Sequence, residues 1–79
     1  MFEECIVLGN GFFMRICFSH GEQYRLSFFG PGKLLVEYKG NSGRHGRVVR
    51  GRALAYEFKS VEKLRYDFER DAEDALRQG

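Results

Sequence analysis

"CIVLGNGFFMRICF", residues 5–18, places Asn10-Gly11 between two apolar runs. Asn-Gly in that position is the strongest short-range signal of a β-hairpin, because both residues tolerate the positive φ of a tight turn. We therefore predict two antiparallel strands, over residues 2–9 and 12–19.

Further turn signals follow toward the C-terminus, at His20-Gly21, at Gly30-Pro31-Gly32 and in the glycine-rich segment 40–46. Glycine and proline interrupt apolar runs in this way where a chain reverses between strands. The runs between these turns predict three more strands, over residues 23–29, 33–39 and 47–58. Because each connection is short, strands adjacent in sequence should pair, which gives a five-stranded antiparallel meander.

The C-terminal segment has a helical period instead. Ser60 is a suitable N-cap, and Glu62 lies in the first turn. Apolar residues then recur at spacings of three and four, at Val61, Leu64, Phe68, Ala72, Ala75 and Leu76. We predict a helix over residues 60–77, with a charged face that points to solvent and includes Asp67, Asp71 and Asp74. The predicted fold is α+β, a single domain over residues 1–79 in which the five-stranded antiparallel β-meander is packed on one face by this single C-terminal α-helix.

Turn lengths predict which residues lie opposite each other on adjacent strands. A two-residue turn at Asn10-Gly11 and three-residue loops at 20–22 and 30–32 give these pairs: Gly9–Phe12, Val7–Met14, Cys5–Ile16, Phe18–Tyr24, Ile16–Leu26, Phe28–Leu34, Leu26–Val36 and Tyr24–Tyr38. One face of the sheet is then almost wholly apolar, and the helix should cover it.

The opposite face has no second helix to cover it. Its apolar centre is predicted to contain Ile6, Leu8, Phe13, Phe29 and Leu35, and its rim Arg15, Arg25, Lys33 and Lys39. This composition is typical of an interaction surface. Two alternatives are that the sheet curls until these side chains half-bury one another, or that the face closes a homodimer.

The segment "GNSGRHGRVVRGR", residues 40–52, is the most basic part of the chain. It lacks the GK[ST] ending of a P-loop, and its GRHG joins two strands, unlike the GXXG loop of KH domains, which joins two helices. Strict alternation along the last strand would bury charge, so we predict a bulge at Gly51 that turns Val49 inward. The outward cations are then Arg44, Arg47, Arg50 and Arg52, with support from Lys39, and they could bind phosphates, bind acidic protein groups or remain a solvated edge.

Composition and charge restrict the class of protein. The 79 residues include eight Phe and four Tyr, which is the composition of a small globular domain. The formal net charge of +2 divides into net +4 over residues 1–59 (nine basic, five acidic) and net −2 over residues 60–79 (four basic, six acidic). No apolar run is long enough to span a bilayer, so we expect a soluble protein in the cytoplasm.

The chain offers little for catalysis. Cys5 and Cys17 are expected on opposite faces as reduced thiols, and His20 and His45 in separate solvated turns. No serine or thiol has a base and an orienting acid in a predictable position. We therefore expect no enzymatic activity, no metal site and no cofactor.

Three stretches make the chain resemble small phage-encoded anti-CRISPR proteins, in particular those directed at type I-C systems: "MFEECIVLGNGFFMRICFS", "GRHGRVVRGR" and "SVEKLRYDFERDAEDAL". The resemblance implies a non-enzymatic inhibitor in the cytoplasm of a bacterial host, which binds the surveillance complex Cascade and blocks its target DNA. Many anti-CRISPR proteins use acidic, DNA-mimicking surfaces, and the basic surface of this chain departs from that pattern. The implied contacts to Cascade subunits are the cations Arg15, Arg25, Lys39, Arg44, Arg47, Arg50 and Arg52 and the apolar anchors Phe13, Phe29 and Leu35.

A second interpretation is a single-stranded nucleic-acid-binding domain that uses the open sheet face and the basic edge. The plain meander and the absence of an RNP1-like string weigh against it. The sequence is compatible with a monomer or a weak homodimer.

Overall fold

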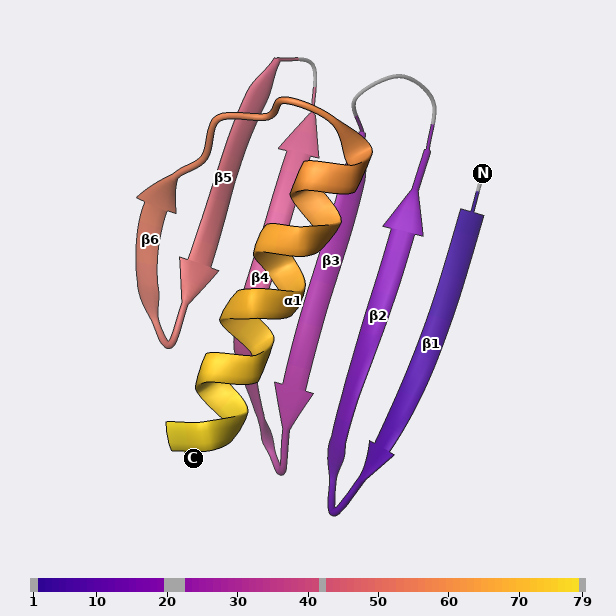
Figure 1. The fold of residues 1–79 in the computed structure, drawn as a ribbon, viewed down its shortest axis with the longest axis vertical. Helices are drawn as coiled ribbons and strands as arrows, with labels where there is room; N and C mark the ends of the chain where they lie inside the picture. The colour runs from indigo at the N-terminus through magenta and orange to yellow at the C-terminus, as the bar shows by residue number, and fades with distance from the viewer. Residues whose placement is uncertain (1, 20–22, 42, 79) are drawn as a thin grey trace.

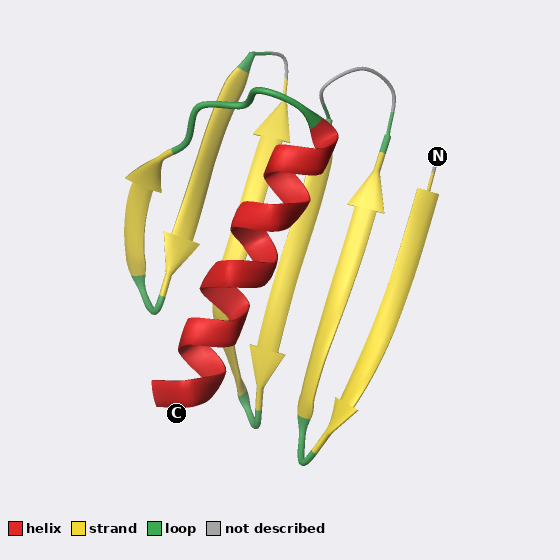
Figure 2. Cartoon of the chain, in the orientation of Figure 1, coloured by secondary structure: helices red, strands yellow, loops and turns green. Residues whose placement is uncertain are grey.

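The computed structural model describes residues 2–19, 23–41 and 43–78. These residues form six strands and one helix: β1 (Phe2–Gly9), β2 (Phe12–Phe18), β3 (Tyr24–Gly30), β4 (Lys33–Asn41), β5 (Arg44–Val49), β6 (Arg52–Ala55) and α1 (Val61–Gln78). The strands form one antiparallel sheet in the order β1-β2-β3-β4-β5-β6. Helix α1 crosses one face of this sheet, in front of β3 and β4 (Figures 1 and 2). The α+β meander with one C-terminal helix is confirmed, but the number of strands is six instead of five.

The predicted strand 47–58 is in fact two strands. Arg50 and Gly51 both have positive φ, 52° and 85°, which is the signature of a tight hairpin turn. The chain therefore reverses at Gly51, where we had predicted only a bulge. Most of the predicted 40–46 loop is strand as well, because β4 extends to Asn41 and β5 begins at Arg44.

The first hairpin forms at Asn10-Gly11 as predicted, but its register differs by one residue. A bulge between Val7 and Gly9 shifts the pairing, and Gly9 adopts a positive φ of 91°. The observed partners are Val7–Phe13, Ile6–Met14, Cys5–Arg15 and Glu4–Ile16, so the predicted Val7–Met14 and Cys5–Ile16 pairs are wrong. Because a one-residue shift exchanges the two faces, Ile6 packs against the core and Val7 lies on the other side.

The next two pairings preserve the predicted faces, except at Leu34 and Leu35. Between β2 and β3, Phe18–Tyr24 and Ile16–Leu26 pair as predicted. Between β3 and β4 the connection is the two-residue turn Pro31-Gly32, and a bulge makes Leu35 the extra residue. The observed pairs are therefore Phe28–Val36, Leu26–Tyr38 and Tyr24–Gly40, two residues from the predicted ones. Leu35 packs against the core and not on the opposite face, which corrects its predicted place among the apolar anchors.

The core lies between α1 and the middle strands. Ser60 Oγ accepts a hydrogen bond from the Lys63 amide (3.1 Å), which confirms the predicted N-cap. Of the predicted apolar positions of the helix, Val61 (48% exposed) and Leu76 (44%) remain outside the core. The buried apolar residues are Ile16, Tyr24, Leu26, Phe28, Val36 and Tyr38 of the sheet and Leu64, Phe68, Ala72 and Ala75 of the helix.

Candidate functional site: the open face of the sheet

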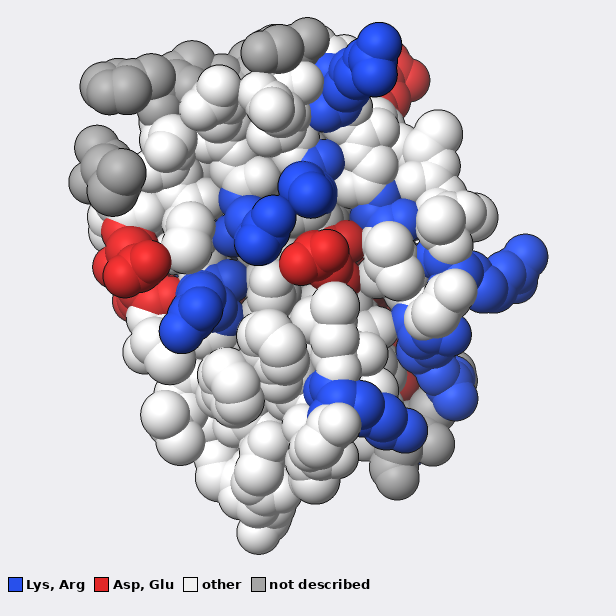
Figure 3. Space-filling model, turned by 180° about the vertical axis from the view of Figure 1, so that it is seen from behind, with Lys and Arg blue, Asp and Glu red and all other residues white. Residues whose placement is uncertain are grey.

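The candidate site is the face of the sheet turned away from α1, called the open face here and seen in Figure 3. No element among the described residues covers it. Strand register and alternation assign to it Glu3, Cys5, Val7, Phe13, Arg15, Cys17, Arg25, Ser27, Phe29, Leu34, Glu37, Lys39, Asn41, Arg44, Gly46, Val48, Ala53 and Ala55.

An apolar row crosses four strands near one end of this face. It consists of Val7, Phe13, Phe29 and Leu34, each paired with the next. The rings of Phe13 and Phe29 are stacked, with centroids 4.7 Å apart and planes 14° apart. Rings this close must overlap face to face, so they stand on edge on the sheet and turn their flat faces toward each other. The row therefore offers ring edges and aliphatic groups to a partner, with Val7 79% exposed.

Basic side chains cross the rest of this face, from Arg15 next to the row to Arg44 near the other end, and form what we call the cation belt: Arg15, Arg25, Lys39 and Arg44. Figure 3 shows blue side chains across the middle of the face and down its right side, with red acidic groups among them and an uncharged region at the lower left. Arg25 Nε lies 3.9 Å from Glu37 Oε2, which also accepts a hydrogen bond from the buried Ser27 hydroxyl (3.5 Å). Arg15, Lys39 and Arg44 form no ion pair within residues 2–19, 23–41 and 43–78. Most of the belt thus remains available to acidic groups of a partner.

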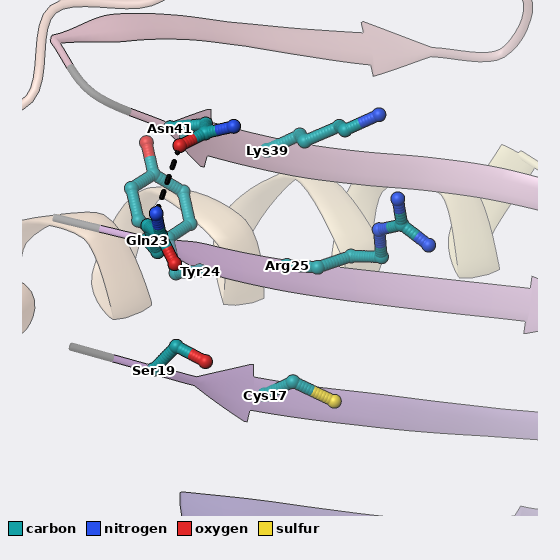
Figure 4. Close-up of a pocket in the computed structure, with 8 residues that line it drawn as sticks. Cys17, Ser19, Gln23, Tyr24, Arg25, Lys39 and Asn41 are labelled. Atoms are coloured by element: carbon teal, nitrogen blue, oxygen red, sulfur yellow. Dashed lines mark hydrogen bonds between the residues drawn. The ribbon is translucent and has the colours of Figure 1, made fainter. Parts of the chain in front are cut away.

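A shallow hollow of about 230 Å³ lies at the other end of the open face (Figure 4). Gln23 Nε2 donates a hydrogen bond to Asn41 Oδ1 (3.0 Å) across it, and Arg25 and Lys39 extend side by side from paired strands. Cys17 also lines it, and its thiol donates to Glu3 Oε2 (3.5 Å). Burial, and then this carboxylate, raise the pKa of Cys17, so its thiol stays protonated and is a poor nucleophile.

Two predictions about cysteine and histidine are wrong. Cys5 and Cys17 share the open face, because the bulge in β1 reverses the face of Cys5, although both thiols are free as expected. His45 lies within β5 and is not in a solvated turn. Its Nδ1 is 3.0 Å from the Tyr24 hydroxyl, and its ring stacks on Phe58 with centroids 5.2 Å apart. His20 lies outside the described residues.

The four arginines of residues 44–52 do not form one surface. Only Arg44 lies on the open face. Arg50 is exposed in the β5–β6 turn, and Arg52 pairs with Val49 and lines a recess beside Asp71 and Asp74 of α1. The predicted basic cluster is therefore divided between two faces and a turn.

Arg47 points toward the helix, which corrects its predicted outward orientation. It lies two residues from Val49 on the same strand, and Val49 packs against the core as predicted, so both side chains occupy the same face. Its Nη1 donates to Tyr38 Oη (2.9 Å) and to Asp71 Oδ2 (3.1 Å), and Tyr38 Oη also donates to Asp71. Arg47 is thus part of the contact between sheet and helix.

Two helix carboxylates predicted to face solvent bind other parts of the chain: Asp71 binds the sheet, and Asp67 binds the segment between β6 and α1. Asp71 joins Arg47 and Tyr38, and Asp67 accepts hydrogen bonds from Tyr56 Oη (2.8 Å) and Lys63 Nζ (2.8 Å). Burial, and then the bond to Asp71, raise the pKa of Tyr38 well above its usual range. A sequence signal for this network did exist: tyrosines at inward positions need a partner for the hydroxyl, and Asp67 and Asp71 flank the apolar helix face.

Acid should weaken the Asp67 contact. Burial raises the pKa of Asp67, but the bonds from Lys63 and Tyr56 outweigh burial and lower the pKa below its ordinary 3.8. A carboxylate with a lowered folded-state pKa stabilises the fold above its unfolded pKa, and this stability is lost as pH falls through the folded pKa. We expect Asp67→Asn to cost about 1–2 kcal/mol at pH 7. The difference from wild type should shrink below about pH 4, as measured by urea denaturation at several pH values, and a constant difference would contradict the assignment.

No family model, no curated protein and no solved structure matches this chain. Among the described residues, no helix is both long and apolar enough to cross a bilayer.

Proposed function

We propose that this chain is a non-enzymatic inhibitor that acts by binding a protein through its open face. The observation that carries the proposal is the apolar row beside a cation belt, on a face that no described element covers. An apolar anchor next to charges that mostly lack internal partners is the composition expected at the centre and rim of a protein interface.

Two features favour a protein partner over a nucleic acid. Base stacking requires an exposed flat ring face, whereas Phe13 and Phe29 cover one face of each other and have Val7 and Leu34 as their outer neighbours in the row. Glu37 also lies among the cations of the belt, and Glu3 lies on the same face, where both would repel phosphates. Carboxylates between cations suit a protein surface that presents both signs of charge.

The proposed partner is a type I Cascade complex, most specifically type I-C, and this choice rests on the resemblance of the sequence to anti-CRISPR proteins. In this proposal, Phe13 and Phe29 are anchors, and Arg15, Arg25, Lys39 and Arg44 contact acidic groups on Cascade subunits. Occupation of that surface prevents target DNA from loading.

The test is a competition experiment with purified type I-C Cascade. We expect the protein to abolish the gel shift of labelled target DNA when it is mixed with Cascade first. The double reversal Arg15→Glu/Lys39→Glu should weaken Cascade binding by roughly 100-fold or more, because like charges at an interface cost several kcal/mol. The matched control Lys59→Glu/Arg70→Glu has the same charge change away from the open face and should bind as wild type does.

Persistence of the DNA shift at saturating protein would refute inhibition of Cascade. Equal effects of the two double reversals would instead refute the open face as the contact. A gel shift of short single-stranded and double-stranded DNA by the protein alone, at two salt concentrations, tests the nucleic-acid alternative. Tight binding that weakens steeply with salt would favour that alternative.

A further inference from the structure

Gly46 lies in the middle of β5, and nothing inside the described chain requires a glycine there. Five of the other described glycines have positive φ in turns or at a bulge, and at Gly40 and Gly30 an added Cβ would collide with the side chains of Tyr24 and Leu35. Gly46 has no positive φ, and a Cβ built on it would meet only the Leu54 carbonyl oxygen, at an ordinary 3.5 Å. Glycine inside a strand costs stability, so its presence at this position calls for an external reason.

The space beside Gly46 is a hollow on the open face. Its volume is about 390 Å³, within the range of protein ligand pockets, roughly 300–1,000 Å³. Small residues leave its floor open: Gly46 lines it, and so does Ala53, which pairs with Val48. Lys39 and Arg44 line it together with Glu37, whose charge is partly offset by Arg25. The hollow therefore has an apolar floor and a positively charged wall.

We infer that this hollow receives an aromatic or large aliphatic side chain from an acidic segment of the partner protein, with the backbone of that segment lying against Gly46. Apolar anchors that enter small pockets carry much of the energy of protein interfaces. The positively charged wall selects an acidic segment, because carboxylates of the partner on either side of its anchor would pair with Lys39 and Arg44. The inference rests on the proposed function and adds to it a specific subsite and the chemistry of its occupant.

The variant that tests the inference is Gly46→Val. Valine fits the backbone, its side chain projects into the hollow beside Gly46, and it has a higher strand propensity than glycine. We expect the thermal midpoint to rise by roughly 2–8 °C, because a glycine inside a strand is removed. We also expect partner binding to weaken by at least about tenfold, since the anchor is displaced. Loss of binding together with a gain in stability distinguishes a filled site from a damaged fold.

A direct readout uses ¹⁵N-labelled protein titrated to millimolar concentration with the peptide acetyl-Glu-Phe-Glu-amide. The amides of Gly46, Val48 and Ala53 should shift with this peptide and not with acetyl-Lys-Phe-Lys-amide. Cys5→Val, a control on the same face but at the opposite side of the sheet, should respond as wild type does, and Gly46→Val should not. No shift at these amides, an equal response of Gly46→Val, or the same shifts with a short oligothymidylate would overturn the inference.

Failure of this inference can be separated from failure of the proposed function. If wild type and Gly46→Val inhibit Cascade equally, the hollow is not the subsite, whereas inhibition itself stands. If wild type does not bind Cascade, the proposed partner is wrong, and the peptide titration still decides whether the hollow accepts an acidic aromatic segment.

Discussion

Phe68→Ala is expected to lower the free energy of unfolding by about 3–5 kcal/mol, the range for removal of a fully buried aromatic ring. Phe68 has no exposed surface, and its ring meets the ring of Tyr38 edge to face, with centroids 5.8 Å apart. It is the largest helix side chain in the core, so its removal leaves a cavity between α1 and the sheet. Urea denaturation followed by circular dichroism at 222 nm measures the loss.

Tyr66→Ala is the matched control. Tyr66 is an aromatic residue on the same helix, but 60% of its surface is exposed, so its removal should change stability by about 0.5 kcal/mol or less. Similar losses for the two variants would mean that α1 does not cover the sheet as described. A domain of this size has little stability in reserve, so Phe68→Ala should also be partly unfolded at 37 °C.

Local chemistry was sufficient to predict most of the fold. Asn10-Gly11 predicted the first hairpin because both residues tolerate positive φ, which they adopt at 55° and 85°. The period of three and four predicted which helix positions are buried, and Phe68 and Leu64 are among them. These features depend on neighbours in sequence, and a sequence records such neighbours directly.

The two bulges could not be predicted, since they depend on how strands fit together. The bulge before Gly9 exchanges the faces of Ile6 and Val7, and the bulge at Leu35 moves that side chain from the open face to the core. Phe13 and Phe29 were placed correctly because the β2–β3 ladder between them is regular. The accuracy of the predicted site thus followed the regularity of each strand pair.

The arginines show a different limit of sequence interpretation. Burial of unpaired charge is costly, so an arginine at an inward position was predicted to turn outward. That argument omits the possibility of a carboxylate from another element, here Asp71 of α1, which lies 24 residues away in sequence. Val49 and Arg47 lie two residues apart on one strand, so the inward position of Val49 already implied an inward Arg47. The cost of burying the arginine charge is offset because Asp71 is its partner.

Arg47→Glu is therefore expected to destabilise the protein by about 2–4 kcal/mol. The substitution removes the charge-assisted hydrogen bonds of the guanidinium to Asp71 and Tyr38, and such bonds normally contribute about 1.5–3 kcal/mol each. It also puts a second carboxylate beside Asp71. The Arg47 side chain retains 32% exposure, so solvent reduces the cost below that of a fully buried pair. Urea denaturation at pH 7 and at two ionic strengths measures it.

Arg44→Glu is the control within the same strand. Arg44 is exposed on the open face and forms no ion pair among the described residues, so its reversal should change stability by about 0.5 kcal/mol or less. In the proposed function it should instead weaken partner binding, because Arg44 belongs to the cation belt. The two variants thus separate stability from binding. If Arg47→Glu left the unfolding transition unchanged, the contact of Arg47 with Asp71 would not be part of what holds α1 on the sheet.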